Sequence, residues 1–153
     1  MSNTIDVRVR VPKDKEDIIN QLIGTKDSDG AFKLIAEVIT FAASLGFKKG
    51  KRVSIGNTAE PIRQSVFISR GFDLAINLIA ISETNDPNIL SNVEEMEKNK
   101  IAIFEEYANG GLEILRRELV GQVDVLNHLL LLIKEEYKDK NDENDDVVLS
   151  DFI

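Results

Sequence analysis

Hydrophobic and polar residues alternate with a period of two near the start of the chain, over residues 5–11. One side of this segment is apolar and the other is polar or charged: Ile5, Val7, Val9 and Val11 against Asp6, Arg8 and Arg10. Such alternation predicts a strand with one buried face. Pro12 should end the strand, because proline has no backbone N–H to donate.

Two helices are predicted to follow this strand. The first begins near Asp14 and ends at Gly24. The second carries apolar residues at intervals of three and four, and Gly46 stands where a left-handed C-cap is expected. Residues 5–47 therefore form a strand-helix-helix unit, the order found in ribbon-helix-helix proteins.

The remainder, residues 58–137, is predicted to be helical throughout. Short helices are expected after Pro61 and over 72–82, and a longer one should end near Ala108. Gly110 and Gly111 are expected to interrupt it before a helix over 112–120. A last, leucine-rich helix spans 123–137. The fold class is thus mainly α, with a single domain over residues 1–138 and one short N-terminal strand.

The C-terminal segment, residues 139–153, has a different composition. It holds six acidic residues against one lysine and ends in an apolar tip. Such a segment cannot form a core of its own and is predicted to be disordered. Leu149, Phe152 and Ile153 could bind a groove on a partner protein, or the tip could fold back onto its own chain.

Composition excludes several kinds of chemistry. The chain has no cysteine and one histidine, His128, so thiolate zinc sites and multi-histidine metal centres are impossible. His128 lies among leucines. The acids Glu105, Glu106, Glu113 and Glu118 interleave with Arg116 and Arg117, as on an exposed, salt-bridged helix face. We therefore expect no enzyme activity and no cofactor or metal. No apolar run reaches the roughly 20 residues of a membrane span, so a cytoplasmic protein is expected.

The charge distribution indicates where an anionic partner would bind. The net charge is −8, yet residues 1–52 carry ten basic residues against seven acidic ones. If the strand pairs with its twin in a homodimer, Arg8 and Arg10 could read base edges in the major groove of DNA. The candidate phosphate contacts are Lys13, Lys15, Lys48, Lys49, Lys51 and Arg52. The alternative is that these side chains form an ordinary polar surface.

Three stretches together are similar to a known family. They are residues 9–16 (VRVPKDKE), 39–48 (ITFAASLGFK) and 103–115 (IFEEYANGGLEIL). In this order they resemble the bacterial DNA phosphorothioation-associated protein 4 family, small proteins encoded with dnd-type DNA sulfur-modification and restriction systems. The resemblance covers about residues 5–137 and implies an accessory role in a defence system, with protein partners from that system. It carries over no site residues.

The sequence therefore favours a non-enzymatic accessory or adaptor protein that acts by contacts with other proteins. The alternative is a ribbon-helix-helix-like DNA-binding regulator. A strand paired within its own chain would favour the adaptor, and a two-fold ribbon with both arginines outward would favour the regulator.

Overall fold

The structure is a computed structural model that describes residues 7–25 and 28–144. The chain divides into two compact units, Met1–Arg117 and Glu118–Ile153, which are described separately below. The predicted domain boundary at residue 138 falls inside the last helix. Helices make up most of the described residues, which confirms the predicted fold class.

The N-terminal strand has the two faces that its alternation predicts. Strand β1 (Arg8–Val9) pairs in antiparallel register with β4 (Ile62–Arg63), and Val9 lies opposite Ile62. Val7, Val9 and Val11 are buried, whereas Arg8 and Arg10 are exposed. The pattern of hydrophobic residues alone therefore determines which side of this segment enters the core.

The partner of this strand differs from the prediction. Its hydrogen bonds go to the same chain: Gln64 N–H donates to the Val7 carbonyl, and Ala59 N–H donates to the Val11 carbonyl. On the other edge, the Arg10 N–H donates to a carboxylate oxygen of Glu105. The expected pairing with a second chain is thus replaced by contacts within the chain, because both edges find their partners there.

Two helices follow the strand, as predicted. A 3₁₀ turn, η1 (Lys13–Lys15), leads into α1 (Glu16–Ile23), and a small hairpin of β2 (Gly24–Thr25) and β3 (Ser28–Asp29) comes next. Helix α2 (Ile35–Lys49) ends at Gly50, whose φ of 66° is left-handed. The predicted C-cap at Gly46 is therefore wrong, and Gly46 is buried inside α2.

The second half of this unit contains three helices. Helix α3 (Gln64–Ser69) and α4 (Asp73–Thr84) are followed by a 3₁₀ turn, η2 (Pro87–Leu90). Helix α5 (Glu94–Leu119) then continues through both adjacent glycines, where the sequence predicted a break. The two predicted helices are one.

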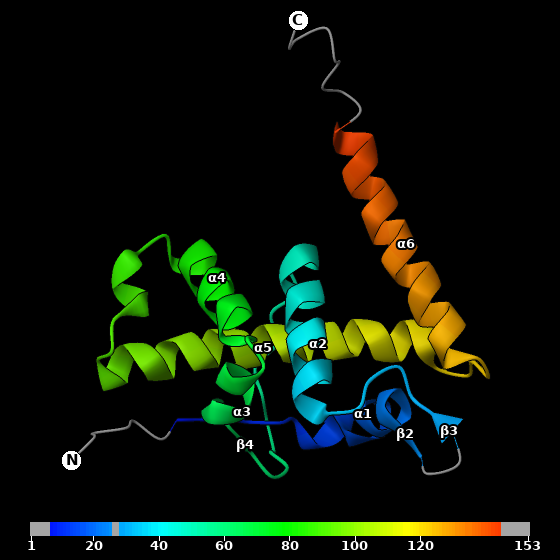
Figure 1. Cartoon of the computed structure of the whole chain (residues 1–153), viewed down its shortest axis with the longest axis horizontal. Coiled ribbons are helices and arrows are strands. Elements are labelled where there is room, and N and C mark those ends of the chain that lie inside the picture. The colour runs from blue at the N-terminus through cyan, green and yellow to red at the C-terminus, as the bar shows by residue number, and fades with distance from the viewer. Residues whose placement is uncertain (1–6, 26–27, 145–153) are drawn as a thin grey trace, which may run out of the picture. The chain divides into compact units, whose positions relative to one another are not determined.

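A close crossing between α2 and α5 explains why glycine is tolerated inside both helices (Figure 1). A Cβ atom on Gly111 would lie 1.7 Å from the Ala42 carbonyl oxygen. A Cβ atom on Gly46 would lie 2.1 Å from the Tyr107 carbonyl oxygen. Only glycine lets the two backbones approach this closely, and this packing offsets the roughly 1 kcal/mol by which glycine weakens a helix relative to alanine.

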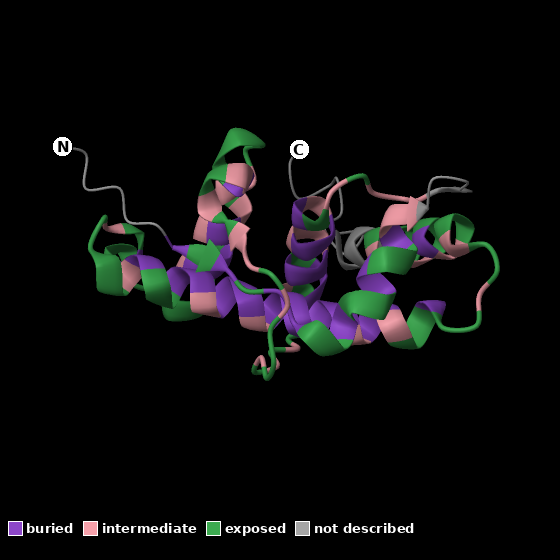
Figure 2. Cartoon of the chain, turned by 90° about the horizontal axis from the view of Figure 1, so that it is seen from below, coloured by how far each residue is buried: buried purple, intermediate pink, exposed green. Residues whose placement is uncertain are grey.

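The core of the first unit follows these two helices. Buried residues form a nearly continuous stretch along the middle of α5 and along α2 (Figure 2). The rings of Phe67 on α3 and Phe104 on α5 meet edge to face, with 5.7 Å between their centroids, and both side chains are fully buried. Helix α5 is thus the element that connects the N-terminal strand, α2 and α3.

The second unit is built on α6 (Val125–Asn144), which follows a turn at Gly121. This helix continues through residues 139–144, the first six residues of the segment predicted to be disordered. One lysine and two asparagines stand among the three acids of this stretch, and such a mixture supports a helix better than a purely acidic run does. In the described parts of the chain, no helix has the length and apolar character needed to cross a membrane.

Candidate functional site

The predicted base-reading residues do not form a free basic face. Arg10 is half exposed, but its Nε lies 3.1 Å from Glu105 Oε2 and its terminal nitrogen lies 3.2 Å from Glu105 Oε1. Only 3% of the Glu105 side chain is exposed. Arg8 is exposed on the same side of β1. The sequence correctly predicted where Arg10 faces, but not that a carboxylate from α5 neutralises it.

Burial governs the electrostatics of this pair. Removal from water raises the pKa of Glu105, and the hydrogen bonds from Arg10 oppose that change without cancelling it. The same hydrogen bonds raise the pKa of Arg10, so its guanidinium remains charged. Glu105 therefore neutralises Arg10 and also accepts the Arg10 backbone N–H. The pair holds the strand against α5.

Lys15, predicted to contact phosphate, is instead buried. Only 2% of it is exposed, and its ammonium donates to Asp14 Oδ2 at 2.8 Å and to Asn109 Oδ1 at 2.9 Å. The Asn109 amide in turn donates to the Ser54 carbonyl at 3.1 Å. The hydrogen bond from Lys15 lowers the pKa of Asp14. A lysine held this way is a structural cation, and the prediction that it contacts phosphate is not compatible with this position.

The basic cluster that follows α2 is also paired with acids. Lys51 Nζ lies 3.2 Å from Glu113 Oε2. Arg52 bridges two helices, with 3.0 Å to Glu83 on α4 and 3.2 Å to Glu106 on α5. Lys48 and Lys49 form the last turn of α2, where cations favour the negative end of the helix dipole. Lys51 and Arg52 therefore join elements of the fold.

A second group supports the Arg52 bridge. The Tyr107 hydroxyl donates to Glu83 Oε2 at 2.5 Å, and the Arg52 guanidinium lies 5.9 Å from the centroid of the Tyr107 ring. Burial, followed by the hydrogen bond to Glu83, raises the pKa of Tyr107. The hydroxyl thus keeps its proton and remains a donor. This network fixes the end of α4 against α5.

A polar cavity of about 330 Å³ lies beside the buried lysine. Lys13 lines it, together with Ser54 and Asn57 from the connector after α2 and with Glu113 from α5. Its lining mixes ammonium groups with carboxylates, so it offers no strong field of either sign. Among the described residues, no group of three or more His, Asp or Glu side chains could hold a metal ion.

The three sequence stretches that suggested a family contact one another around the α2–α5 crossing and the buried lysine. The first supplies Arg10 and Lys15, the second supplies Gly46, and the third supplies Glu105 and Asn109. A family model described as DNA sulphur modification system-associated protein 4 matches residues 8–152. The chain belongs to this family. No curated protein and no solved structure matches the chain.

For a member of the DNA sulphur modification system-associated protein 4 family, the position of these stretches is informative. They form the packing centre of the first unit, where the α2–α5 crossing, the buried lysine and the strand-to-helix ion pair coincide. In this chain the residues named from the three stretches thus contribute to the packing of the first unit.

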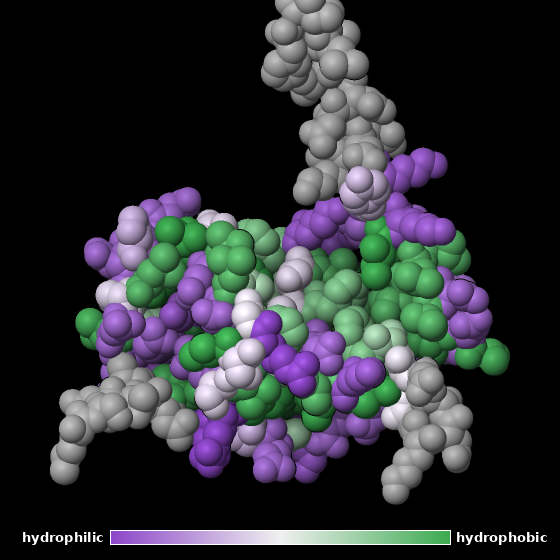
Figure 3. All heavy atoms as spheres, in the orientation of Figure 1, coloured by the Kyte–Doolittle hydropathy of each residue, from purple (hydrophilic) through white to green (hydrophobic). Residues whose placement is uncertain are grey.

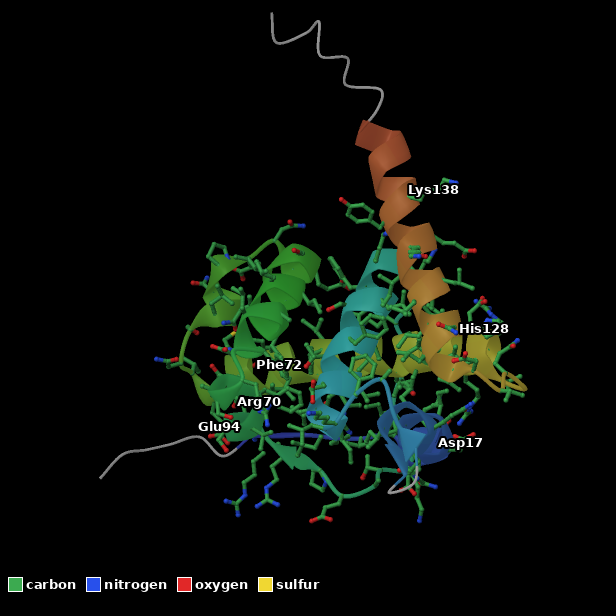
Figure 4. The ribbon with its side chains drawn as sticks, turned by 45° about the vertical axis from the view of Figure 1, so that its right-hand side comes forward. Asp17, Arg70, Phe72, Glu94, His128 and Lys138 are labelled. Atoms are coloured by element: carbon green, nitrogen blue, oxygen red, sulfur yellow. The ribbon has the colours of Figure 1, made fainter. Side chains whose placement is uncertain are left out.

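The predicted partner-binding residues and the single histidine belong to the second unit. Leu149, Phe152 and Ile153, predicted to bind a partner, lie outside the described residues. His128 is partly exposed on α6 (Figure 4). Its backbone N–H donates to the carbonyl of Asp124, the residue just before that helix.

The surface feature that sequence reasoning missed is the exposed apolar side of α6. Large apolar side chains on this helix are 42% to 65% exposed: Leu126, Leu130, Leu131, Ile133 and Tyr137. Leu129, between them in sequence, is only 3% exposed. The signal in the sequence was the apolar run 129–133, which is too long to lie on one face of a helix. The sequence alone could not show whether all of these side chains are buried or only those on one side.

Smaller apolar patches occur on the first unit. Leu74 and Leu78 lie one turn apart on α4 and are both more than half exposed. Hydrophobic side chains are visible over α4 and η2 among hydrophilic ones (Figure 3). Isolated exposed leucines are common in proteins, so these two carry less weight than the five on α6.

Proposed function

We propose that this protein is a non-enzymatic accessory protein of a DNA sulphur modification system, which acts by binding other proteins of that system. The observation that carries the proposal is the set of five large apolar side chains exposed on α6. Exposing them to water is unfavourable by roughly 25 cal/mol per Å² of apolar surface. A protein partner that covers them would recover this free energy.

The acidic residues that could have supported catalysis are used in structural contacts. Glu105 pairs with Arg10, Glu106 pairs with Arg52, and Glu113 pairs with Lys51. A general acid or base needs a carboxyl group that can reach a substrate. Their engagement in the packing centre favours a binding protein over an enzyme.

DNA binding through the N-terminal strand is the alternative function, favoured by the exposure of Arg8 and Arg10 on one side of β1. Against it stand the ion pair of Arg10, the burial of Lys15 and the net charge of −8. Phosphate binding depends on a positive field. We therefore expect no retardation of duplex DNA, with or without phosphorothioate linkages, in a gel at low salt. Retardation lost in the Arg8→Ala, Arg10→Ala double variant would favour the alternative.

Co-expression tests the proposed function directly. The full chain, tagged, is expressed with the other proteins of a DNA sulphur modification system, and the bound proteins are identified by mass spectrometry. We expect one of them to co-purify with the parent and to be lost with the Leu130→Ser, Ile133→Ser double variant.

The matched control is Asn127→Ser, an exposed polar change on the same helix. It should leave co-purification unchanged. If the double variant retains every bound protein while its circular dichroism matches the parent, the proposed function is wrong.

A further inference from the structure

Four of the exposed side chains on α6 lie along one line of the helix. Leu126, Leu130, Ile133 and Tyr137 follow one another at intervals of four, three and four residues, and they are 48%, 46%, 42% and 65% exposed. We call them the α6 stripe. This spacing is that of the a and d positions of a heptad, whose side chains meet a facing helix as knobs in holes.

The side of α6 next to the stripe is less accessible. Val125, His128, Leu132 and Glu136 are partly buried, and Leu129 is buried. These five positions also recur at helical intervals, so a less accessible face of α6 borders the exposed apolar stripe. An open seam about two heptads long fits a second helix, because an extended strand or a flat surface offers no matching holes.

The charge of the second unit restricts the kind of helix. Residues 118–153 contain ten acidic residues against three lysines, a net charge of −7, whereas residues 1–117 carry a net charge of −1. Six of these ten acids follow the stripe in sequence, in the segment 139–151. A helix beside the stripe therefore experiences a negative potential.

This potential opposes two other occupants. A second copy of the chain would bring two units of charge −7 together, which is electrostatically unfavourable. An anionic lipid surface would be repelled for the same reason.

We infer that the α6 stripe binds a basic amphipathic helix of a partner protein. Its apolar residues would repeat at intervals of three and four to fill the seam, and its lysines and arginines would complement the net negative charge of residues 118–153. The inference rests on the proposed function and adds to it the chemistry of the partner.

Three synthetic peptides test this chemistry against the full chain. Each is a helix of about five turns with the same leucine stripe, long enough to form in water when bound. Their remaining positions carry lysine, glutamate or glutamine. By fluorescence anisotropy at low salt, the lysine peptide should bind about tenfold more tightly than the glutamine peptide, and the glutamate peptide should not bind. The advantage of lysine should shrink as salt rises.

Two variants of the chain locate the contact. Leu130→Ser with Ile133→Ser should abolish binding of the lysine peptide, whereas the control Asn127→Ser should not change it. Neutralising three acids by Asp139→Asn, Asp142→Asn and Glu143→Gln should reduce the preference for lysine over glutamine and leave glutamine binding unchanged. Each variant is first compared with the parent by thermal unfolding, which should match.

Three results would overturn the inference: equal binding of all three peptides, preference for the glutamate peptide, or binding that survives the double serine variant. Sedimentation equilibrium of the full chain adds a fourth. A dimer that disappears with the double serine variant would show that a second copy occupies the stripe.

These failures are distinct from failure of the proposed function. If the peptides show no charge preference but a protein of the modification system still requires the stripe to co-purify, the function stands and the inference falls. If the lysine peptide binds the stripe but co-purification is unaffected by the double serine variant, the inference stands and the proposed function falls.

Discussion

At the scale of single residues, most charged side chains in the packing centre form hydrogen bonds and ion pairs that hold elements of the fold together. Lys15 is fully buried, and Asn109 both accepts from its ammonium and donates to the connector carbonyls of Val53 and Ser54. A buried ammonium that loses such a partner remains charged in a poorly solvating environment. One asparagine therefore keeps the N-terminal turn, the connector and α5 together.

Removing this amide should destabilise the protein strongly. Asn109→Ala leaves the Lys15 ammonium with Asp14 as its hydrogen-bonded partner and leaves the connector carbonyls without their donor, so we expect a loss of about 3 kcal/mol in the free energy of unfolding. Urea denaturation followed by circular dichroism measures it. Asn99→Ala, an exposed asparagine on the same helix, should change the value by less than about 0.5 kcal/mol. Equal losses in both variants would contradict the role of Asn109.

The raised pKa of Glu105 should be detectable in the pH dependence of the free energy of unfolding. Burial raises the pKa of this carboxyl in the folded protein, so protonation favours folding, and that contribution is lost as pH rises through the folded-state pKa. Glu105→Gln removes this titration. We expect the variant to gain stability relative to the parent as pH rises from about 4.3, the unperturbed pKa of glutamate, through the raised folded-state pKa.

The comparison between variant and parent is essential, because Asp14 and Asp17 have lowered pKa values and contribute the opposite trend. Their stabilising contribution is present above their unfolded-state pKa and is lost in acid. Both proteins are denatured with urea at several pH values, and the contribution of the two aspartates cancels in the difference between their free energies of unfolding. A difference that stays constant, or that shifts toward the parent at higher pH, would contradict the raised pKa of Glu105.

At the scale of elements, the α2–α5 crossing determines the architecture of the first unit. Backbone contacts at Gly46 and Gly111 bring the two helices together, and the ring of Phe47 on α2 meets that of Tyr107 on α5 with 5.4 Å between centroids. The side chain of Asn109 leaves α5 beside this crossing to reach Lys15. One short segment of α5 thus organises both the apolar packing and the polar network.

The substitution Gly111→Ala tests the crossing by the sign of its effect. In an isolated helix, alanine in place of glycine stabilises by about 1 kcal/mol. Here the new Cβ atom would lie 1.7 Å from the Ala42 carbonyl oxygen, so we expect destabilisation by at least about 3 kcal/mol. Gly56→Ala, whose Cβ atom would meet no neighbour within 4 Å, should be nearly neutral. A stabilised Gly111→Ala protein would show that the helices are not in close contact.

The elements also show what the sequence could and could not determine. Periodicity correctly predicted the buried side of β1 and the two helices after it, because these depend on neighbours in sequence. The adjacent glycines of α5 were interpreted as a break, since local propensity disfavours glycine in a helix. Similarly, the pairing of Arg10 with Glu105 joins residues 95 positions apart. Both features depend on tertiary contacts that no local pattern contains.

At the scale of the whole molecule, the two units differ in composition and in surface. The first has a nearly balanced charge and encloses the packing centre, whereas the second has a net charge of −7 and exposes the α6 stripe. This division assigns the fold to one unit and the proposed contacts to the other. The sequence predicted an acidic C-terminal segment with partner-binding residues in its last positions, which lie outside the described residues, and it gave no prediction for the exposed apolar side of the helix before them.

Such a division predicts that the first unit folds without α6. A chain that ends after Gln122 retains β1, α1–α5 and every residue of the packing centre. We expect it to unfold cooperatively in urea, with a denaturant dependence reduced in proportion to the smaller surface exposed. The effect of Asn109→Ala should be the same in the short and the full chain, because distant sites contribute independently. Non-cooperative unfolding of the short chain would mean that α6 is needed to complete the core, and the exposed stripe could then no longer be treated as a surface separate from folding.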